Sequence, residues 1–164
     1  EQYPEVIYKY NPFYHVTNTS KSLMMAMESV SGDDLIWING DVFLEPEVVK
    51  RVLSSKGNII AVNKSKCGEE EVKYITDGSG KIIRISKTIS DAEGESVGVN
   101  KVTASHFGLF SDSLRECGDN DYFEKGIEIC IDKGTEFFPV DISDCDCIEV
   151  DFREDYERVK EILK

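Results

Sequence analysis

Acidic side chains follow two apolar segments of this chain, one in each half. Asp41 comes shortly after the apolar run at 35–38. Glu149 and Asp151 alternate with apolar residues over 148–151, so a strand there would place both carboxylates on one face. Carboxylate oxygens are ligands that Mg²⁺ prefers in proteins. The pattern therefore predicts Asp41, Glu149 and Asp151 as metal ligands.

Simpler interpretations of these acids stay open at this point. A Gly-Asp pair after a strand also makes a good turn, which would leave Asp41 without a chemical role. Asp151 stands three residues before Glu154, a spacing that is typical of a capping pair at the start of a helix. Gly40, in turn, would let a bulky polyphosphate approach the backbone at the end of the strand.

Composition limits the classes of partner. The 164 residues, 40% of them hydrophobic, are enough for one substantial core and predict a single domain. The 32 acidic and 19 basic residues give a formal net charge of -13, which disfavours nucleic acid and anionic membranes as partners. A small phosphorylated ligand fits this charge only together with a divalent cation, and Mg²⁺ is the expected cofactor.

The cysteines and the apolar stretches indicate a compartment. Five cysteines, at positions 67, 117, 130, 145 and 147, form no Cys-x-x-Cys pair and no zinc spacing with the two histidines. An odd number of thiols without a signal peptide favours a reducing compartment. No apolar stretch approaches the roughly 20 residues that cross a bilayer. We therefore expect a cytoplasmic, soluble protein, and a homo-oligomer is one of the states that the sequence allows.

Apolar periodicity predicts an α/β fold. The apolar run at 35–38, a helix that begins at Pro46 and ends at Gly57, and a second apolar run form a strand–helix–strand unit. The turn residues at 77–80 predict a hairpin between two further strands. The expected helices span 20–30, 46–56 and 122–132, and the expected strands 6–8, 35–38, 59–62, 72–75, 81–85, 99–110, 137–140 and 148–151.

The order of short motifs resembles that of a known family. The motifs are Asn11-Pro12-Phe13-Tyr14, Thr17-Asn18 with Ser22-Leu23, Ile38-Asn39-Gly40-Asp41, Ile85-Ser86-Lys87, Gly94-Glu95-Ser96-Val97-Gly98, and Ile148-Glu149-Val150-Asp151 with Glu154-Asp155. Together they resemble the sugar-phosphate and phosphocholine nucleotidyltransferases. The resemblance implies a Rossmann-like α/β/α sandwich with a small β-extension. It also implies transfer of a nucleoside monophosphate from an NTP to a phosphorylated acceptor, with release of pyrophosphate.

The resemblance also implies roles for single residues. Asp41 and Asp151, with Glu149 beside the latter, resemble the carboxylates that hold Mg²⁺. Lys87 is similar to the lysine that meets the phosphate of the acceptor, although an exposed structural lysine is the alternative. Asp41, Lys87 and Asp151 are thus the expected catalytic residues.

Four positions are expected to contact substrate. They are Gly40, Asn18, Ser22 and Glu95. Glu95 matches the glutamate of a Gly-Glu-x-x-Gly turn near the acceptor, where the alternative is a loop anchor. Asn18 and Ser22 occupy a segment near the nucleotide or acceptor, and Asn18 is alternatively a neighbour of a helix cap. The Asn-Pro-x-Tyr and Thr-Asn motifs favour CTP as the nucleotide and a choline, sugar or polyol phosphate as the acceptor.

One departure from the family pattern concerns the triphosphate. Family members carry a Gly-rich, Arg-containing loop and then a Pro-Lys segment, and neither occurs in residues 1–164. We therefore expect a single nucleotidyltransferase-like domain that is the C-terminal portion of a longer catalytic domain. The alternatives are a partner that supplies the missing layer, a catalytically inactive regulatory or binding module, and a metal-dependent glycosyltransferase of similar fold.

Overall fold

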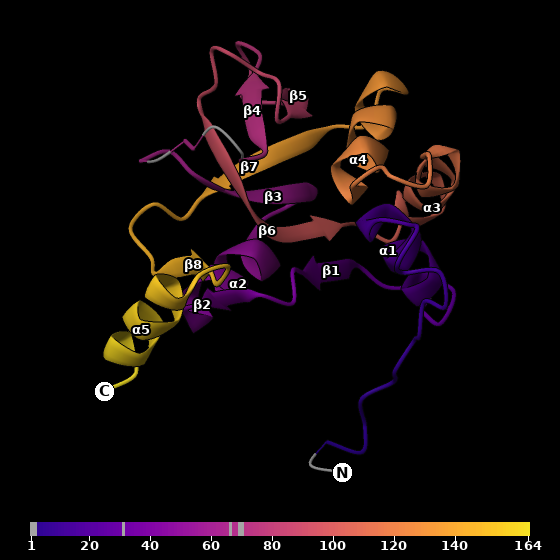
Figure 1. Ribbon diagram of the computed structural model, residues 1–164. Coiled ribbons are helices and arrows are strands. Elements are labelled where there is room, and N and C mark those ends of the chain that lie inside the picture. Colours follow the sequence, from indigo (N-terminus) through magenta and orange to yellow (C-terminus); the bar gives the residue numbers. More distant parts are fainter. Residues whose placement is uncertain (1–2, 31, 66, 69–70) are drawn as a thin grey trace.

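A mixed sheet forms the centre of the computed structural model, which describes residues 3–30, 32–65, 67–68 and 71–164. The strands of the main sheet follow the order β5-β4-β6-β3-β7, and β1 pairs with β6 beside this path. A separate ribbon pairs β2 with β8 (Figure 1). The helices are α1 (Thr19–Met27), α2 (Pro46–Ser54), α3 (Phe107–Glu116), α4 (Phe123–Asp132) and α5 (Arg153–Ile162). The strands are β1 (Leu35–Ile38), β2 (Val42–Leu44), β3 (Asn58–Asn63), β4 (Lys73–Thr76), β5 (Ile82–Ser86), β6 (Gly94–Val102), β7 (Phe137–Asp141) and β8 (Cys147–Glu149).

Helices cover both faces of the sheet, and β3 shows why. Ile60 and Val62 belong to the larger core cluster, which also contains residues of α1, α3 and α4. Ile59 and Ala61 point the other way, into a second cluster with Val48 and other residues of α2. All four of these strand residues are buried, so the continuous apolar run reflects a strand that is covered on both faces. The predicted α/β sandwich is thereby confirmed.

The strand–helix–strand unit of β1, α2 and β3 is present, but β6 lies between its two strands. Both β1 and β3 pair with β6 in antiparallel register, which makes β1 and β3 parallel to each other. The single parallel pair described is β3 with β7. β4 and β5 form the predicted hairpin, and β4 joins the edge of β6. Within this one sheet, β6 therefore links the β4–β5 hairpin to β1.

Two strand predictions are wrong. Over 6–8 the chain forms no strand; it is exposed and extends away from the domain, and the segment before α1 is drawn in Figure 1 as a trailing coil. The strand expected over 99–110 ends at Val102, and Phe107 already begins α3. Alternation and helical spacing are indistinguishable over so short an apolar run, so packing against α4 decides it. None of the helices in the described residues has the length and apolar character of a membrane span.

Candidate functional site

A cleft of about 400 Å³ opens at the carboxyl end of β1. Its floor is the end of that strand and the turn that follows, including Asn39, Gly40 and Asp41. Residues of α1, of the start of α4, of β6 and of β8 also line the cleft, together with Glu71, Val72 and Lys87. Ligands of open α/β sheets gather at this end of the strands. The cleft therefore lies where the sequence places Gly40 and Asp41.

Asp41 lies directly beside the segment that carries the other two acids. Val42 is paired with Glu149 across the ribbon, and the backbone carbonyl of Asp41 accepts a hydrogen bond of 2.8 Å from Val150 N. Because Val150 separates Glu149 from Asp151, both acids flank the point of contact with Asp41. Asp41 and Glu149 line the cleft, whereas Asp151 lies outside that lining. The prediction that one strand carries Glu149 and Asp151 on the same face is wrong, because β8 ends at Glu149.

The carboxylates affect one another electrostatically. Desolvation raises the pKa of Glu149, and the negative charges of Asp41, Asp151 and Glu71 raise it further. A side-chain hydrogen bond with Asn39 opposes this rise. The protonated form is favoured here because burial, and after it the nearby like charges, disfavour the carboxylate. A bound cation would offset those like charges at this point.

These side chains fit a Mg²⁺ site in which the substrate supplies some of the ligands. In the described part of the chain, no three His, Cys, Asp or Glu side chains form a ready-made metal site. Mg²⁺ is commonly held by one or two carboxylates and completes its coordination with substrate phosphates and water. Asp41 and Glu149, which share the cleft, supply such a pair. The assignment of Asp41, Glu149 and Asp151 as ligands stays a prediction.

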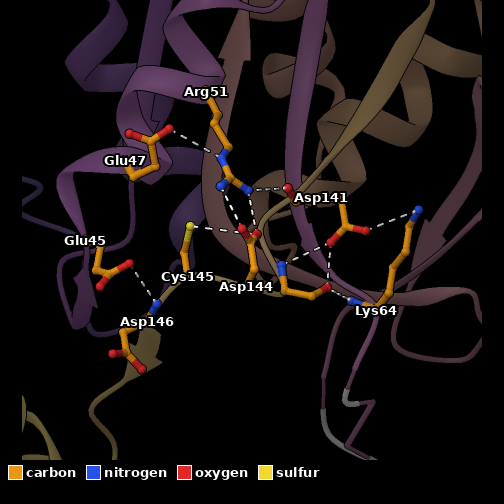
Figure 2. A network of polar contacts seen from close by, with 9 residues as sticks. Glu45, Glu47, Arg51, Lys64, Asp141, Asp144, Cys145 and Asp146 are labelled. Carbon is orange, nitrogen blue, oxygen red and sulfur yellow. Dashed lines mark hydrogen bonds and ion pairs between the residues drawn. The ribbon is translucent and has the colours of Figure 1, made fainter.

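Polar contacts hold the connection into β8 against both ends of α2 (Figure 2). Arg51 donates two hydrogen bonds to Asp144, of 2.6 and 2.8 Å, and a third to the carbonyl of Asp141. Glu45 N donates to the carbonyl of Asp146, and Asp146 N donates back to the Glu45 carboxylate. Asp144 accordingly has its pKa lowered to about 2 by the Arg51 guanidinium. These contacts fix the strand that presents Glu149 to the cleft.

Lys87 lines the same cleft as the acids. Its Nζ lies 5.1 Å from the centre of the Tyr122 ring, within the range of a cation–π contact. The ring holds a side chain that is otherwise long and flexible. Lys87 is thus available to an anionic ligand, and its role toward a phosphate stays a prediction.

The predicted Gly-Glu-x-x-Gly turn is wrong, because residues 94–98 belong to β6. Glu95 faces a second cavity, which it shares with Ser143 and Asp144, and its carboxylate accepts a hydrogen bond from Gly68 N. Glu95 does not line the main cleft, and its role toward the acceptor stays a prediction.

Gly98 is required by conformation and by space. Its φ is +72°, in the region that favours glycine, and a Cβ there would lie 2.7 Å from the Asn39 side chain. The Gly98 carbonyl also accepts a hydrogen bond of 2.9 Å from Asn39 N. This close approach fixes the turn before Asp41. At Gly40, by contrast, no atom lies within 4 Å of an added Cβ, so the protein itself leaves that space open.

Asn18 and Ser22 lie outside the lining of the cleft. Asn18 is the N-cap of α1, and its Oδ1 accepts a hydrogen bond of 2.8 Å from Thr19 N. Ser22 Oγ accepts one of 3.0 Å from Asn11 Nδ2. Both contacts explain the residues structurally, and their predicted contact with substrate is untested.

Capping does not explain Asp151. The N-cap of α5 is Phe152, whose backbone N–H donates a hydrogen bond of 2.9 Å to the Asp155 carboxylate. The hypothesis that Asp151 caps this helix is therefore wrong, and Asp151 is an exposed carboxylate next to the ribbon.

Sequence reasoning missed Glu124. It lies in the first turn of α4, lines the cleft and is only 9% exposed. Burial raises its pKa from the usual 4.5 to about 7. A hydrogen bond from its own backbone N–H and the positive charge of Lys87 oppose this rise, and the negative charge of Glu149 adds to it. A signal existed, because Glu124 precedes Ile127 and Ile131 by three and seven residues and so shares their apolar stripe.

Comparisons place the fold among known structures. No family model matches the sequence, and no curated protein matches it. The inositol-1-phosphate CTP transferase from T. maritima superimposes with a TM-score of 0.74 at 18% identity, over 90% of this chain and 62% of that one. The CTP:phosphocholine cytidylyltransferase from Streptococcus pneumoniae gives 0.71 at 17% identity, over 94% and 67%.

A third solved structure, the nucleoside-diphosphate-sugar pyrophosphorylase from Vibrio cholerae RC9, gives a TM-score of 0.60 at 13% identity, over 86% of this chain and 64% of that one. The chain therefore spans 62–67% of the length of these solved chains. At identities of 13–18%, the matches establish that this chain has the fold of the nucleotidyltransferases.

Proposed function

We propose that this chain forms part of a nucleotidyltransferase, which transfers a nucleoside monophosphate from an NTP to a phosphorylated small molecule and releases pyrophosphate. One observation carries the proposal: in this fold, the cleft at the end of β1 combines Asp41 and Glu149 with Lys87. CTP is the favoured nucleotide. The Asn-Pro-x-Tyr and Thr-Asn motifs support it, as do two structural neighbours named as CTP-dependent transferases.

Nucleotidyl transfer needs acidic residues that hold a metal ion and a basic residue that binds a phosphate. An oxygen of the acceptor phosphate attacks the α-phosphorus of the NTP, and the bond to the pyrophosphate leaving group breaks. Catalysis of such a transfer is mostly positioning and neutralisation of charge, so no protein nucleophile is needed. When bound, Mg²⁺ screens the negative charges of the phosphates. Asp41 and Glu149 would hold it, with Asp151 beside them, and Lys87 would meet the phosphate of the acceptor.

The role of Lys87 depends on its place in the cleft. A lysine is a compact point charge that can follow a phosphate oxygen as the acceptor settles. The Tyr122 ring restricts the same side chain without neutralising it. Lys87 therefore supplies a positive charge to this acidic cleft and gives the acceptor phosphate a preferred orientation.

Pyrophosphate release by the full-length protein tests the proposal. CTP, UTP and dTTP are each combined with choline phosphate, a sugar 1-phosphate or a polyol phosphate, with and without Mg²⁺. We expect release that requires both Mg²⁺ and an acceptor and is fastest with CTP. Residues 1–164 alone are expected to show little turnover, because no Gly-rich phosphate loop occurs in them. Ligand binding by the full-length protein without any turnover would instead indicate an inactive binding module.

A further inference from the structure

Three buried polar atoms without partners belong to residues that line the cleft. Among the described residues, Glu124 Oε2, Trp37 Nε1 and Ser96 Oγ are buried and lack a hydrogen-bond partner. A buried polar atom that is left unpaired costs stability, typically about 1–3 kcal/mol, and is usually satisfied by a ligand or water. The three atoms are an acceptor, a donor and a hydroxyl that does both. The clustering of such atoms at one cleft indicates a ligand with matching groups.

Glu124 is the strongest of these groups. The helix that carries it packs its Phe123 and Ile127 into the core, so the carboxylate is held in place rather than free to reach solvent. The described residues give Glu124 no ion pair within 4 Å, although Lys87 lines the same cleft. A carboxylate in this position accepts hydrogen bonds from a donor on the ligand.

The aromatic residues of the cleft are already engaged with other groups. Trp37 stacks on Phe110 with ring centres 4.9 Å apart and meets Phe123 edge to face at 5.7 Å. The Tyr122 ring carries the Nζ of Lys87. A quaternary ammonium group needs open ring faces and can donate no conventional hydrogen bond. The negative charge of the lining would attract any cation, so charge alone does not select the ligand, whereas the unpaired atoms do.

We propose, on the basis of the proposed function, that the acceptor is a phosphorylated polyol or sugar and that Glu124 determines this specificity by accepting a hydrogen bond from one of its hydroxyl groups. A hydroxyl group both donates and accepts, so the same ligand satisfies the Glu124 carboxylate and the Trp37 N–H. The phosphate of the acceptor lies toward Lys87. An acceptor that ends in a trimethylammonium group leaves all three atoms unpaired.

Binding to the purified chain tests this specificity. Dissociation constants are measured by NMR titration for inositol 1-phosphate, glucose 1-phosphate, phosphocholine and inorganic phosphate. We expect the polyol and sugar phosphates to bind at least about tenfold more tightly than phosphocholine, the scale of one hydrogen bond to a charged group. Glu124→Met, which lacks a carboxylate or amide oxygen to accept the hydroxyl, should remove most of this preference, whereas Glu124→Gln, whose amide oxygen still accepts a hydrogen bond, should remove only part of it.

Two further variants separate the possible outcomes. Glu128→Gln, on the same helix but outside the cleft lining, is the matched control and should bind like the original chain. Lys87→Ala should lower the affinity for every phosphorylated ligand. If Lys87→Ala has this effect while phosphocholine binds as tightly as the polyols, or while Glu124→Met keeps the full preference, the specificity inference is wrong and the proposed function stands. If no phosphorylated ligand binds more tightly than inorganic phosphate, both are wrong.

Discussion

The buried carboxylate of Glu124 makes the stability of the fold depend on pH. Its folded-state pKa of about 7 lies above the usual value of 4.5, chiefly because of burial. The folded chain therefore keeps this proton up to a higher pH than the unfolded chain does. The resulting stabilisation of the protonated form is fully present below pH 4.5. It is lost as the pH rises through about 7.

The size of this term follows from the two pKa values. A difference from 4.5 to about 7 corresponds to about 3 kcal/mol, at about 1.4 kcal/mol per pKa unit. Most of it, about 2.5 kcal/mol, falls between pH 5 and pH 8. Glu124→Gln removes the titration and keeps the shape of the side chain. The free energy of unfolding of this variant, relative to the original chain, should thus rise by about 2.5 kcal/mol between pH 5 and pH 8.

Urea unfolding followed by tryptophan fluorescence measures this difference. The chain has one tryptophan, Trp37, which is 8% exposed and lines the same cleft. Glu128→Gln is the control, because Glu128 forms a partly exposed ion pair with Lys125 whose loss should cost less than about 1 kcal/mol at either pH. If the difference between Glu124→Gln and the original chain is the same at pH 5 and pH 8, Glu124 is not held as a desolvated carboxyl group.

Three other predictions concern the turn at the end of β1. Asp41→Asn should lower turnover of the full-length protein by about 100-fold and change stability by no more than about 1 kcal/mol; unchanged rates at saturating Mg²⁺ would remove Asp41 from the active site. Mn²⁺ should broaden the NMR signals of Asp41 and Glu149 first, and uniform broadening over all acidic residues would contradict a specific site. Gly98→Ala should lower the free energy of unfolding by about 1–3 kcal/mol, since its φ of +72° and its approach to Asn39 both disfavour a side chain. Gly78→Ala, with open space around it, should cost less than that, and equal losses for the two variants would refute this reason.

Much of the sheet could be predicted because its signals are local. The run that forms β3 is apolar at every position from Ile59 to Val62, which only a strand covered on both faces requires. The turn residues at 77–80 likewise predicted the hairpin of β4 and β5. Where the signal is short, local reasoning failed: Phe107 and its neighbours fit a strand as well as a helix, and contacts with α4 decided between them.

The sequence by itself determined that Asp41 follows an apolar strand and that Glu149 and Asp151 lie on a second segment. The expectation that this strand is covered on both faces is wrong, because Ile38 at its end is 43% exposed. Only the tertiary structure decided that these segments are paired, because the register of β2 with β8 depends on contacts between residues more than a hundred positions apart. The same holds for Glu124, which the sequence puts on the apolar stripe of a helix without showing what covers that stripe. Its burial arises when α4 packs against α3, β5 and α1, and long-range packing of this kind is what changes an ordinary glutamate into a desolvated group in a cleft.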